Sequence, residues 1–198
     1  MLALSQGASM AWQLAAREAA RAQQRYIERE SVFLGICQLG TRLRAAAPGT
    51  AGFSSGKVPG RSGLAEAETV EELLGTHALT PKILCRAVRT AVGRGNHGHG
   101  SEAVVHRSQA CKTCFQRASA LAASAHAREI HCLHLLAALL EHPGAVLTGV
   151  LGVFRVDCKA LQAQIMATVF ALDAIHARAA NKGQGVSHLI YVGGDGQR

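Results

Sequence analysis

An internal repeat constrains the fold of this 198-residue chain more than any other feature. The segment SQGASMAWQLAAREAARAQQRYIERESVFLGICQLG, from Ser5, aligns without a gap with SQACKTCFQRASALAASAHAREIHCLHLLAALLEHP, which begins 103 residues later at Ser108. A second pair, ELLGTHALTPKILCRAV from Glu72 and GVLGVFRVDCKALQAQI from Gly149, aligns at an offset of 77 residues. Because self-similarity at a fixed spacing marks duplicated supersecondary units, two related halves are predicted.

The difference between the two offsets predicts a loop insertion of about 26 residues in the first half. Residues 41–69 contain this insertion and are rich in Gly, Ser and Pro, which is typical of a loop. The predicted organisation is one domain over 4–172, with repeat one at 4–96 and repeat two at 105–172. Residues 173–198 are predicted to form a C-terminal extension.

Each repeat has the pattern of packed helices. Ser5 and Ser108 are predicted helix N-caps, because a serine hydroxyl can accept from an unpaired amide of the first turn. A stripe of small residues after Ser5 lets a neighbouring helix approach closely. Further helices are predicted at Glu30–Leu39, Leu133–Leu140, Val70–Leu74 with Gly75 as a glycine cap, and Pro81–Val92. The predicted fold class is therefore all-α: a single compact domain with a pseudo-twofold duplicated helical repeat.

Composition excludes several classes of protein. Nearly half of the residues are hydrophobic, so a buried core is expected. No run of about 18 apolar residues occurs, so no membrane-spanning helix or membrane partner is expected. Six cysteines without a recognisable secretion signal indicate reduced thiols and a cytoplasmic location. No cofactor is predicted.

The duplicated pattern resembles the Clp N-terminal domain, which stands at the front of Clp-family AAA+ unfoldases. The resemblance covers roughly Leu4 to Ala171, and its most specific strings are AREAARAQQRYIERESVFLGI and REIHCLHLLAALLEH. It implies a non-enzymatic module that recognises protein clients or adaptors for an ATP-dependent Clp chaperone or protease. Clp ATPase or peptidase subunits are then further expected partners.

A Clp unfoldase also needs a nucleotide-binding motor, whose phosphate loop has four residues between two glycines and a Ser or Thr after the lysine. The nearest string here, GFSSGKV, has three residues between its glycines and Val58 after Lys57. It is therefore not interpreted as a phosphate loop. Either the protein is a stand-alone relative of the Clp N-terminal domain, or its motor lies outside this sequence.

The resemblance also suggests candidate binding residues. In some relatives a glutamate at the corner before the apolar helix, and a hydroxyl near the repeat start, help to bind phosphorylated arginine on substrates. The matching pairs here are Ser5 with Glu30, which has both groups, and Ser108 with Leu133, which has lost the carboxylate. A carboxylate can hold a guanidinium group bidentately and a hydroxyl can bond a phosphate. The full set of partner-binding candidates is Ser5, Tyr26, Glu30, Ser31, Ser108 and His134.

Two alternatives concern the cysteines and the aromatic residues. Cys111 and Cys114 form a C-x-x-C pair, which could contribute to a zinc site. The repeat alignment places them where the first half has alanines, so they are predicted as small core residues and no metal site is predicted. Tyr26 and Trp12 are interpreted chiefly as core residues, with a groove for a client peptide as the alternative.

A nucleic-acid-binding helical protein is the competing functional hypothesis. The chain carries a net charge of +8, and arginines recur at spacing four along the first predicted helix. Such a ridge could meet phosphates, although a solvated face has the same pattern. The ridge consists of Arg17, Arg21, Arg25 and Arg29.

A third hypothesis is an inactive remnant that keeps the fold without a ligand site.

Overall fold

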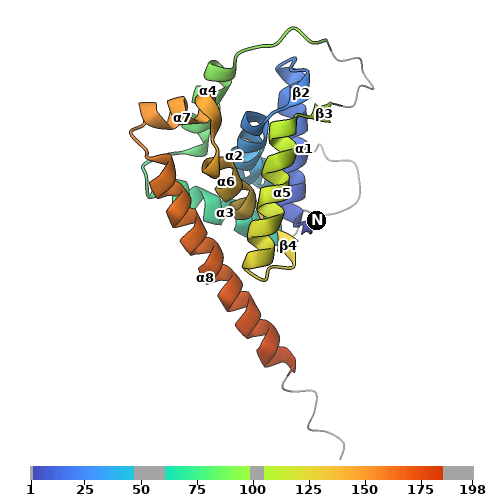
Figure 1. Cartoon of the computed structure of the whole chain (residues 1–198), viewed down its shortest axis with the longest axis vertical. Helices are drawn as coiled ribbons and strands as arrows, with labels where there is room; N and C mark the ends of the chain where they lie inside the picture. Colours follow the sequence, from blue (N-terminus) through green and yellow to red (C-terminus); the bar gives the residue numbers. More distant parts are fainter. Residues whose placement is uncertain (1, 47–60, 99–104, 185–198) are drawn as a thin grey trace, which may run out of the picture.

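The computed structural model describes residues 2–46, 61–98 and 105–184, with the backbone alone from 172 onward. Within these ranges the fold is all-α, as predicted (Figure 1). The elements of the first half are β1 (Ala3–Leu4), α1 (Gln6–Arg21), β2 (Tyr26–Ile27), α2 (Arg29–Ala45), α3 (Arg61–Gly75) and α4 (Pro81–Val92). Those of the second half are β3 (His106–Arg107), α5 (Gln109–Ser124), β4 (Glu129–Ile130), α6 (Cys132–Glu141), α7 (Gly144–Val153) and α8 (Cys158–Gln184).

The duplication is confirmed by the backbone. Helices α1 and α5, and the starts of α2 and α6, are related by the first offset, and the starts of α4 and α8 by the second. Even the left-handed residues repeat, with φ of 53° at Gln23 and 58° at His126, and 55° at Ala78 and 57° at Arg155. Left-handed backbone is uncommon outside glycine. Its recurrence shows that the turns are duplicated although their residue types have diverged.

Four two-residue strands join the halves, and these were not predicted from the sequence. β1 pairs in parallel with β4, and β2 pairs in parallel with β3, so each pair takes one strand from each half. The amide of Ser5 donates to Ile130 O at 3.0 Å, and that of Ser108 donates to Ile27 O at 3.1 Å. Each capping serine is therefore held against the corner of the opposite repeat. Strands this short give no alternating pattern that a sequence could reveal.

The hydrophobic core is centred on α6, whose Leu135, Leu136 and Leu139 are fully buried. Helix α1 packs against α2 through the predicted stripe of small residues. A Cβ added at Gly35 on α2 would collide with the carbonyl oxygen of Ala11 on α1. The absence of a side chain at Gly35 therefore lets the two helices approach this closely.

Three predicted boundaries were wrong. Helix α2 continues to Ala45 and α3 begins at Arg61, so the predicted loop over 41–69 is helical at both ends; 47–60 lies outside the described residues. The predicted helix at Val70–Leu74 is the last part of α3. The left-handed residue after it is Ala78, and Gly75 is the last residue of α3 rather than a left-handed glycine cap.

The predicted C-terminal extension does not begin at a break in the chain. Helix α8 runs through residue 172 and ends at Gln184; residues 185–198 lie outside the described part. In Figure 1 its C-terminal half projects away from the helical body. Predicted helix α4 has the expected bounds, and Thr80 caps it by accepting from the amide of Ile83 at 3.4 Å.

Among the described helices, none is by itself long and apolar enough to cross a membrane. The pair α6 and α7 reaches the required length and apolarity together, but its two helices are bent by 96° relative to each other.

Candidate functional site

The exchange of strands creates two related junctions between the repeats. In the first junction the N-terminus of α1, capped by Ser5, meets the start of α6 at His131 and Cys132. In the second junction the N-terminus of α5, capped by Ser108, meets the start of α2. The amides of the first turn of a helix have no partner within the helix and carry partial positive charge. Each junction is therefore suited to an anionic group.

The first junction is filled by a side chain of the protein itself. The Glu66 carboxylate, on α3, accepts from Ser5 Oγ at 2.9 Å, Gly7 N at 3.2 Å and Cys132 N at 2.9 Å. His131 Nδ1 lies 3.6 Å from the same carboxylate. Burial raises the pKa of Glu66, but the bonds from His131, Cys132 and Ser5 outweigh it and the net pKa is lowered. The first junction thus holds a buried carboxylate anion.

Among the residues that the structure describes, no carboxylate bonds the second junction in the way that Glu66 bonds the first. Glu66 lies nine residues before the end of α3, and the residue nine before the end of α7 is Gly144. Gly144 has φ of 71°, and a Cβ there would lie 2.6 Å from a guanidinium nitrogen of Arg29 and 3.6 Å from Glu30 Oε1. Arg29 also donates to the carbonyl oxygen of His142. The backbone of α7 therefore reaches the second junction, but with no side chain to fill it.

Charged groups of both signs surround the N-terminus of α5. Ser108 Oγ is half-buried and accepts from the amide of Cys111 at 3.1 Å. Burial raises the pKa of the Cys111 thiol to about 12; Arg107 lowers this pKa, and Glu28 and Glu30 raise it further. The charges of all three side chains thus act on the first turn of α5. The second junction combines a hydroxyl, helix amides and carboxylates.

The predicted pairing of hydroxyl and corner residues was wrong. It joined Ser5 to Glu30 and Ser108 to Leu133, each within one repeat. Because the strands cross between halves, Ser5 lies at the start of α6 and Ser108 lies at the corner before α2. Ser5 is 1% exposed and bonded to Glu66, so it is not accessible. The exchange of strands therefore places Ser108, rather than Ser5, at the corner that precedes Glu30.

Two other candidates have structural roles. Ser31 is buried and donates to Gln24 Oε1 at 3.1 Å. His134 is buried, and its Nδ1 accepts from the amide of His131 at 3.0 Å, which caps α6. Both side chains have structural hydrogen bonds and are nearly buried, and their role as contact residues stays a prediction.

The two aromatic candidates differ in their surroundings. Tyr26 is 38% exposed, so the core interpretation was wrong for it, and the Arg25 guanidinium carbon lies 5.2 Å from its ring centre. Trp12 is half-buried and packs edge-on against Phe115, with ring centres 5.3 Å apart. The Trp12–Phe115 contact joins α1 to α5, which lie next to each other in Figure 1.

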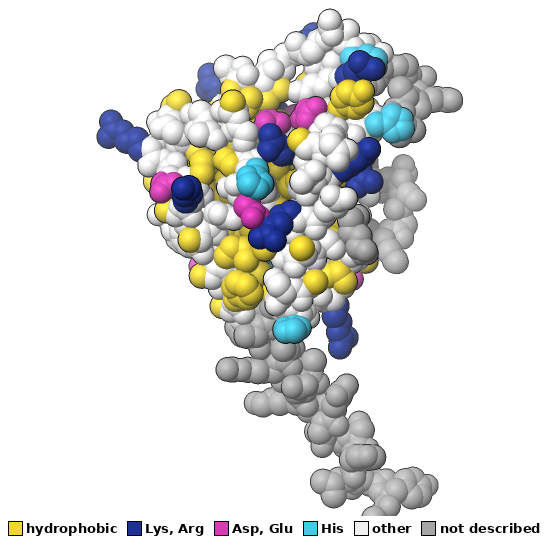
Figure 2. Space-filling view, viewed as in Figure 1, with side chains coloured by type: hydrophobic (Ala, Val, Ile, Leu, Met, Phe, Trp, Pro, Cys, Tyr) yellow, Lys and Arg dark blue, Asp and Glu magenta, His cyan; other side chains and the backbone are white. Residues whose placement is uncertain are grey.

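The predicted arginine ridge is not continuous. Helix α1 ends at Arg21, so only Arg17 and Arg21 share it. Arg25 lies in the turn that follows, and Arg29 begins α2 and bonds to His142. Figure 2 shows lysine and arginine side chains spread over the visible face rather than gathered in one patch. The four arginines therefore do not form one helix face, and nucleic-acid binding stays an alternative hypothesis.

The C-x-x-C cysteines are buried in the core, as the repeat alignment predicted, with Cys111 0% and Cys114 4% exposed. Within the described ranges no three His, Cys, Asp or Glu side chains come together as a metal site would require.

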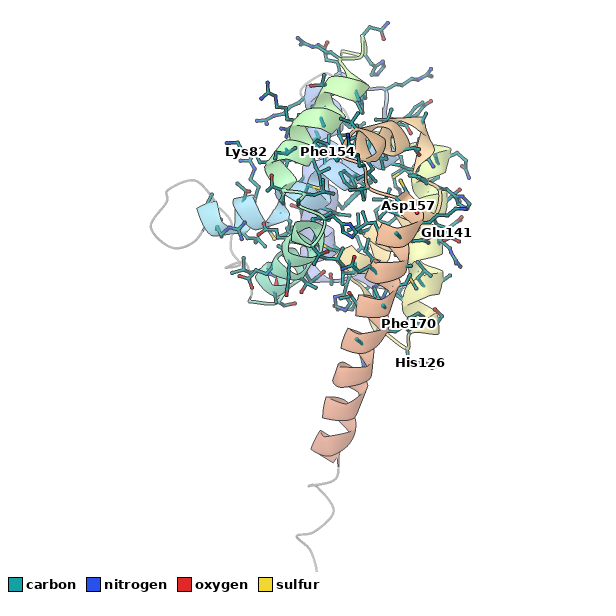
Figure 3. All side chains as sticks on the ribbon, turned by 90° about the vertical axis from the view of Figure 1, so that its left-hand side faces the viewer. Lys82, His126, Glu141, Phe154, Asp157 and Phe170 are labelled. Atoms are coloured by element: carbon teal, nitrogen blue, oxygen red, sulfur yellow. The ribbon has the colours of Figure 1, made fainter. Side chains whose placement is uncertain are left out.

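Two cavities that the sequence did not indicate flank α4. The cationic cavity, of about 1050 Å³, lies between α1, α2 and α4, and Glu30 and Ser31 are among its lining residues. The apolar groove, of about 840 Å³, lies between α4 and α7. Figure 3 labels Lys82, which lines the first, and Phe154, which lines the second. Helices distant in sequence form both, so no local motif could have revealed them.

No protein-family model and no curated protein sequence matches this chain. Among solved structures, it is similar to one described as "Preliminary structural investigations of a malarial protein secretion system". The superposition has a TM-score of 0.59, covers 85% of this chain and 95% of that chain, and the two sequences are 10% identical. At this identity the similarity concerns the fold alone.

Proposed function

We propose that this protein is a non-enzymatic interaction module that recognises clients or adaptors for an ATP-dependent Clp chaperone or protease in the cytoplasm. The proposal combines the sequence resemblance to the Clp N-terminal domain with the geometry of the second junction. The observation that carries it is that, among the described residues, no acidic side chain bonds the capping serine of the second junction as Glu66 bonds Ser5 in the first. The first junction demonstrates that this local geometry accepts an anion, because it holds the carboxylate of Glu66.

The groups around the second junction suit a ligand with adjacent positive and negative charge. Ser108 Oγ and the first amides of α5 can bind a phosphate, since hydroxyl and amide donors bind anions at a helix N-terminus. The charges of Glu28 and Glu30 act on Cys111 in the same turn, and a carboxylate can take a guanidinium group. Phosphorylated arginine on a client carries both groups. Its recognition at Ser108 and Glu30 is therefore the specific form of the proposal.

The exposed residues of the apolar groove support a role in binding protein. Val153 is 79% exposed and Ile83 is 46% exposed, and both line the groove. Neighbouring exposed apolar side chains are typical of surfaces that contact other proteins. A client held at the second junction has this second surface available for its apolar segments.

Isothermal titration calorimetry with a peptide that carries one phosphorylated arginine tests the proposal. We expect one binding site, and a loss of affinity of about tenfold or more in Ser108→Ala and Glu30→Gln, because each removes a charge-assisted contact. Thr113→Ala is the matched control, since it removes an exposed hydroxyl from the same helix. The unphosphorylated peptide should bind weakly. Equal binding of both peptides, or unchanged affinity in both variants, would contradict the proposal.

A further inference from the structure

The cationic cavity contains a pair of thiols that the sequence gives no reason to associate. Cys37 on α2 and Cys85 on α4 both line it, and both are nearly buried, at 2% and 5% exposed. They are 48 residues apart in the chain, yet the packing of α2 against α4 places both at the same cavity wall, where each thiol affects the pKa of the other. The pair therefore lies at the wall of a cavity open to solvent.

The surroundings make the two thiols chemically unequal. The hydrogen bond from Cys37 lowers the pKa of Cys85, burial opposes this, Arg89 lowers it further and Glu18 raises it; the net pKa is lowered. The same bond, burial, and the charges of Cys85 and Glu71 raise the pKa of Cys37. Cys85 is thus the better nucleophile, and Cys37 is the thiol that keeps its proton.

Arg89 is held where it can act on Cys85. It lies one turn further along α4, and its Nε and Nη2 atoms donate to the Glu18 carboxylate at 2.8 and 3.0 Å. This bidentate pair joins α4 to α1 and fixes the guanidinium group at the cavity wall. A positive charge beside a thiol at the wall of a cavity favours the thiolate form of the cysteine.

The other cysteines have the opposite environment. Burial raises the pKa of Cys111 and of Cys114 to about 12, and it also raises the pKa of Cys132 and Cys158. Of the six cysteines in the chain, Cys85 is therefore the one whose thiolate is favoured. The pair with reactive character is not the C-x-x-C pair that the sequence presents.

The cavity also selects by charge. Glu18 and Glu30 are its acidic side chains, and Glu18 is already paired with Arg89. An anionic reagent is attracted to such a wall, and a cationic one is repelled. The cationic side chains that line the cavity are Arg21, Arg42, Lys82, Arg89 and Arg94.

We propose that Cys37 and Cys85 form a redox-active dithiol that reacts with an anionic low-molecular-weight disulfide. The Cys85 thiolate attacks one sulfur of the disulfide, which forms a mixed disulfide and releases one thiolate of the reagent. Cys37 then loses its proton and attacks the Cys85 sulfur, which forms the Cys37–Cys85 bond and releases the second reagent thiol. The two protein thiols are oxidised, and one reagent disulfide is reduced to two thiols. The two thiols are not part of the second junction, although Glu30 lies at both the junction and the cavity wall.

The test uses the folded full chain and oxidised glutathione, an anionic disulfide, with acid quenching and peptide mapping by mass spectrometry. We expect a Cys37–Cys85 cross-link and an intact protein that has lost two hydrogens. Glutathione attached to Cys158, or a Cys111–Cys114 bond, with Cys85 still free would overturn the proposal. This result needs no variant, so it does not depend on whether a substituted core folds.

Variants and a second reagent separate the two steps and the charge selection. Cys37→Ser should stop at glutathione attached to Cys85, whereas the matched control Cys111→Ser should form the cross-link at the wild-type rate. Circular dichroism establishes that each variant is folded. Cystamine, a cationic disulfide, should react about tenfold or more slowly than oxidised glutathione at low salt, with the difference reduced by added salt. Equal rates for the two reagents would overturn the anionic preference.

Discussion

Replacement of Glu66 by alanine is predicted to destabilise the protein strongly. The carboxylate joins three elements, because it accepts from Ser5 and Gly7 at the start of α1 and from Cys132 at the start of α6 while it extends from α3. Its side chain is 11% exposed. Glu66→Ala leaves these donors in a half-buried pocket with no protein acceptor, and a small cavity in place of the side chain.

The magnitude follows from the number and kind of bonds lost. A hydrogen bond to a charged group contributes about 1.5–3 kcal/mol, and Glu66 accepts three of them. The gain is reduced because the burial of the carboxylate itself costs free energy. Water can also reach part of the vacated space. We expect a loss of about 3–5 kcal/mol in Glu66→Ala, and a smaller loss of about 1–2 kcal/mol in Glu66→Gln, which keeps one acceptor oxygen.

Urea unfolding monitored by circular dichroism measures these losses. The midpoint should fall while the slope with denaturant stays unchanged, which indicates a change in stability alone. Glu68→Ala is the matched control, because Glu68 lies on the same helix and is exposed; its effect should be within about 0.5 kcal/mol. A loss below about 1 kcal/mol in Glu66→Ala would refute the argument that this carboxylate fills and stabilises the first junction.

Three further predictions concern stability. Gly35→Ala should lower the free energy of unfolding by about 2–4 kcal/mol, because its Cβ collides with the α1 backbone. Gly149→Ala on α7, where a Cβ meets open space, should be neutral or stabilising, and thermal unfolding compares the two variants. The lowered pKa of Glu66 stabilises the fold above its ordinary pKa of 4.5, so the difference between wild type and Glu66→Gln should shrink as the pH falls below that value; a constant difference from pH 7 to 3 would contradict this. The Cys37–Cys85 cross-link should raise the free energy of unfolding by roughly 3–4 kcal/mol in urea without reductant; no rise would indicate strain in the bonded state.

Much of the fold could be predicted from the sequence because the two repeats keep similar residue types at matching positions. Ser5 and Ser108 recur at the same place since each accepts from an amide three residues later, and few side chains can do so. The alanines of α1 recur as small residues of α5 because close helix packing limits their volume. Helix capping and close helix packing therefore explain why the serines and the small residues recur in both repeats.

The site was harder to predict because it depends on contacts between repeats. The alignment relates Ser5 to Ser108, but it does not indicate that each serine faces the corner of the other repeat. The two-residue strands that bring about this exchange carry no periodic pattern. Glu66 lies in a segment predicted as a loop, so its carboxylate was not considered as a ligand within the chain. The Cys37–Cys85 contact is likewise visible only after α2 and α4 have packed.

An NMR titration of the ¹⁵N-labelled chain with phosphoarginine tests the central claim most directly, because it reports on both junctions in one experiment. The account predicts that the amide signals of Gln109, Ala110 and Cys111, in the first turn of α5, shift on addition of the ligand. Those of Gly7 and Cys132 should stay in place, because Glu66 already occupies the first junction. Shifts confined to the first junction, or no shift at either junction, would contradict the account.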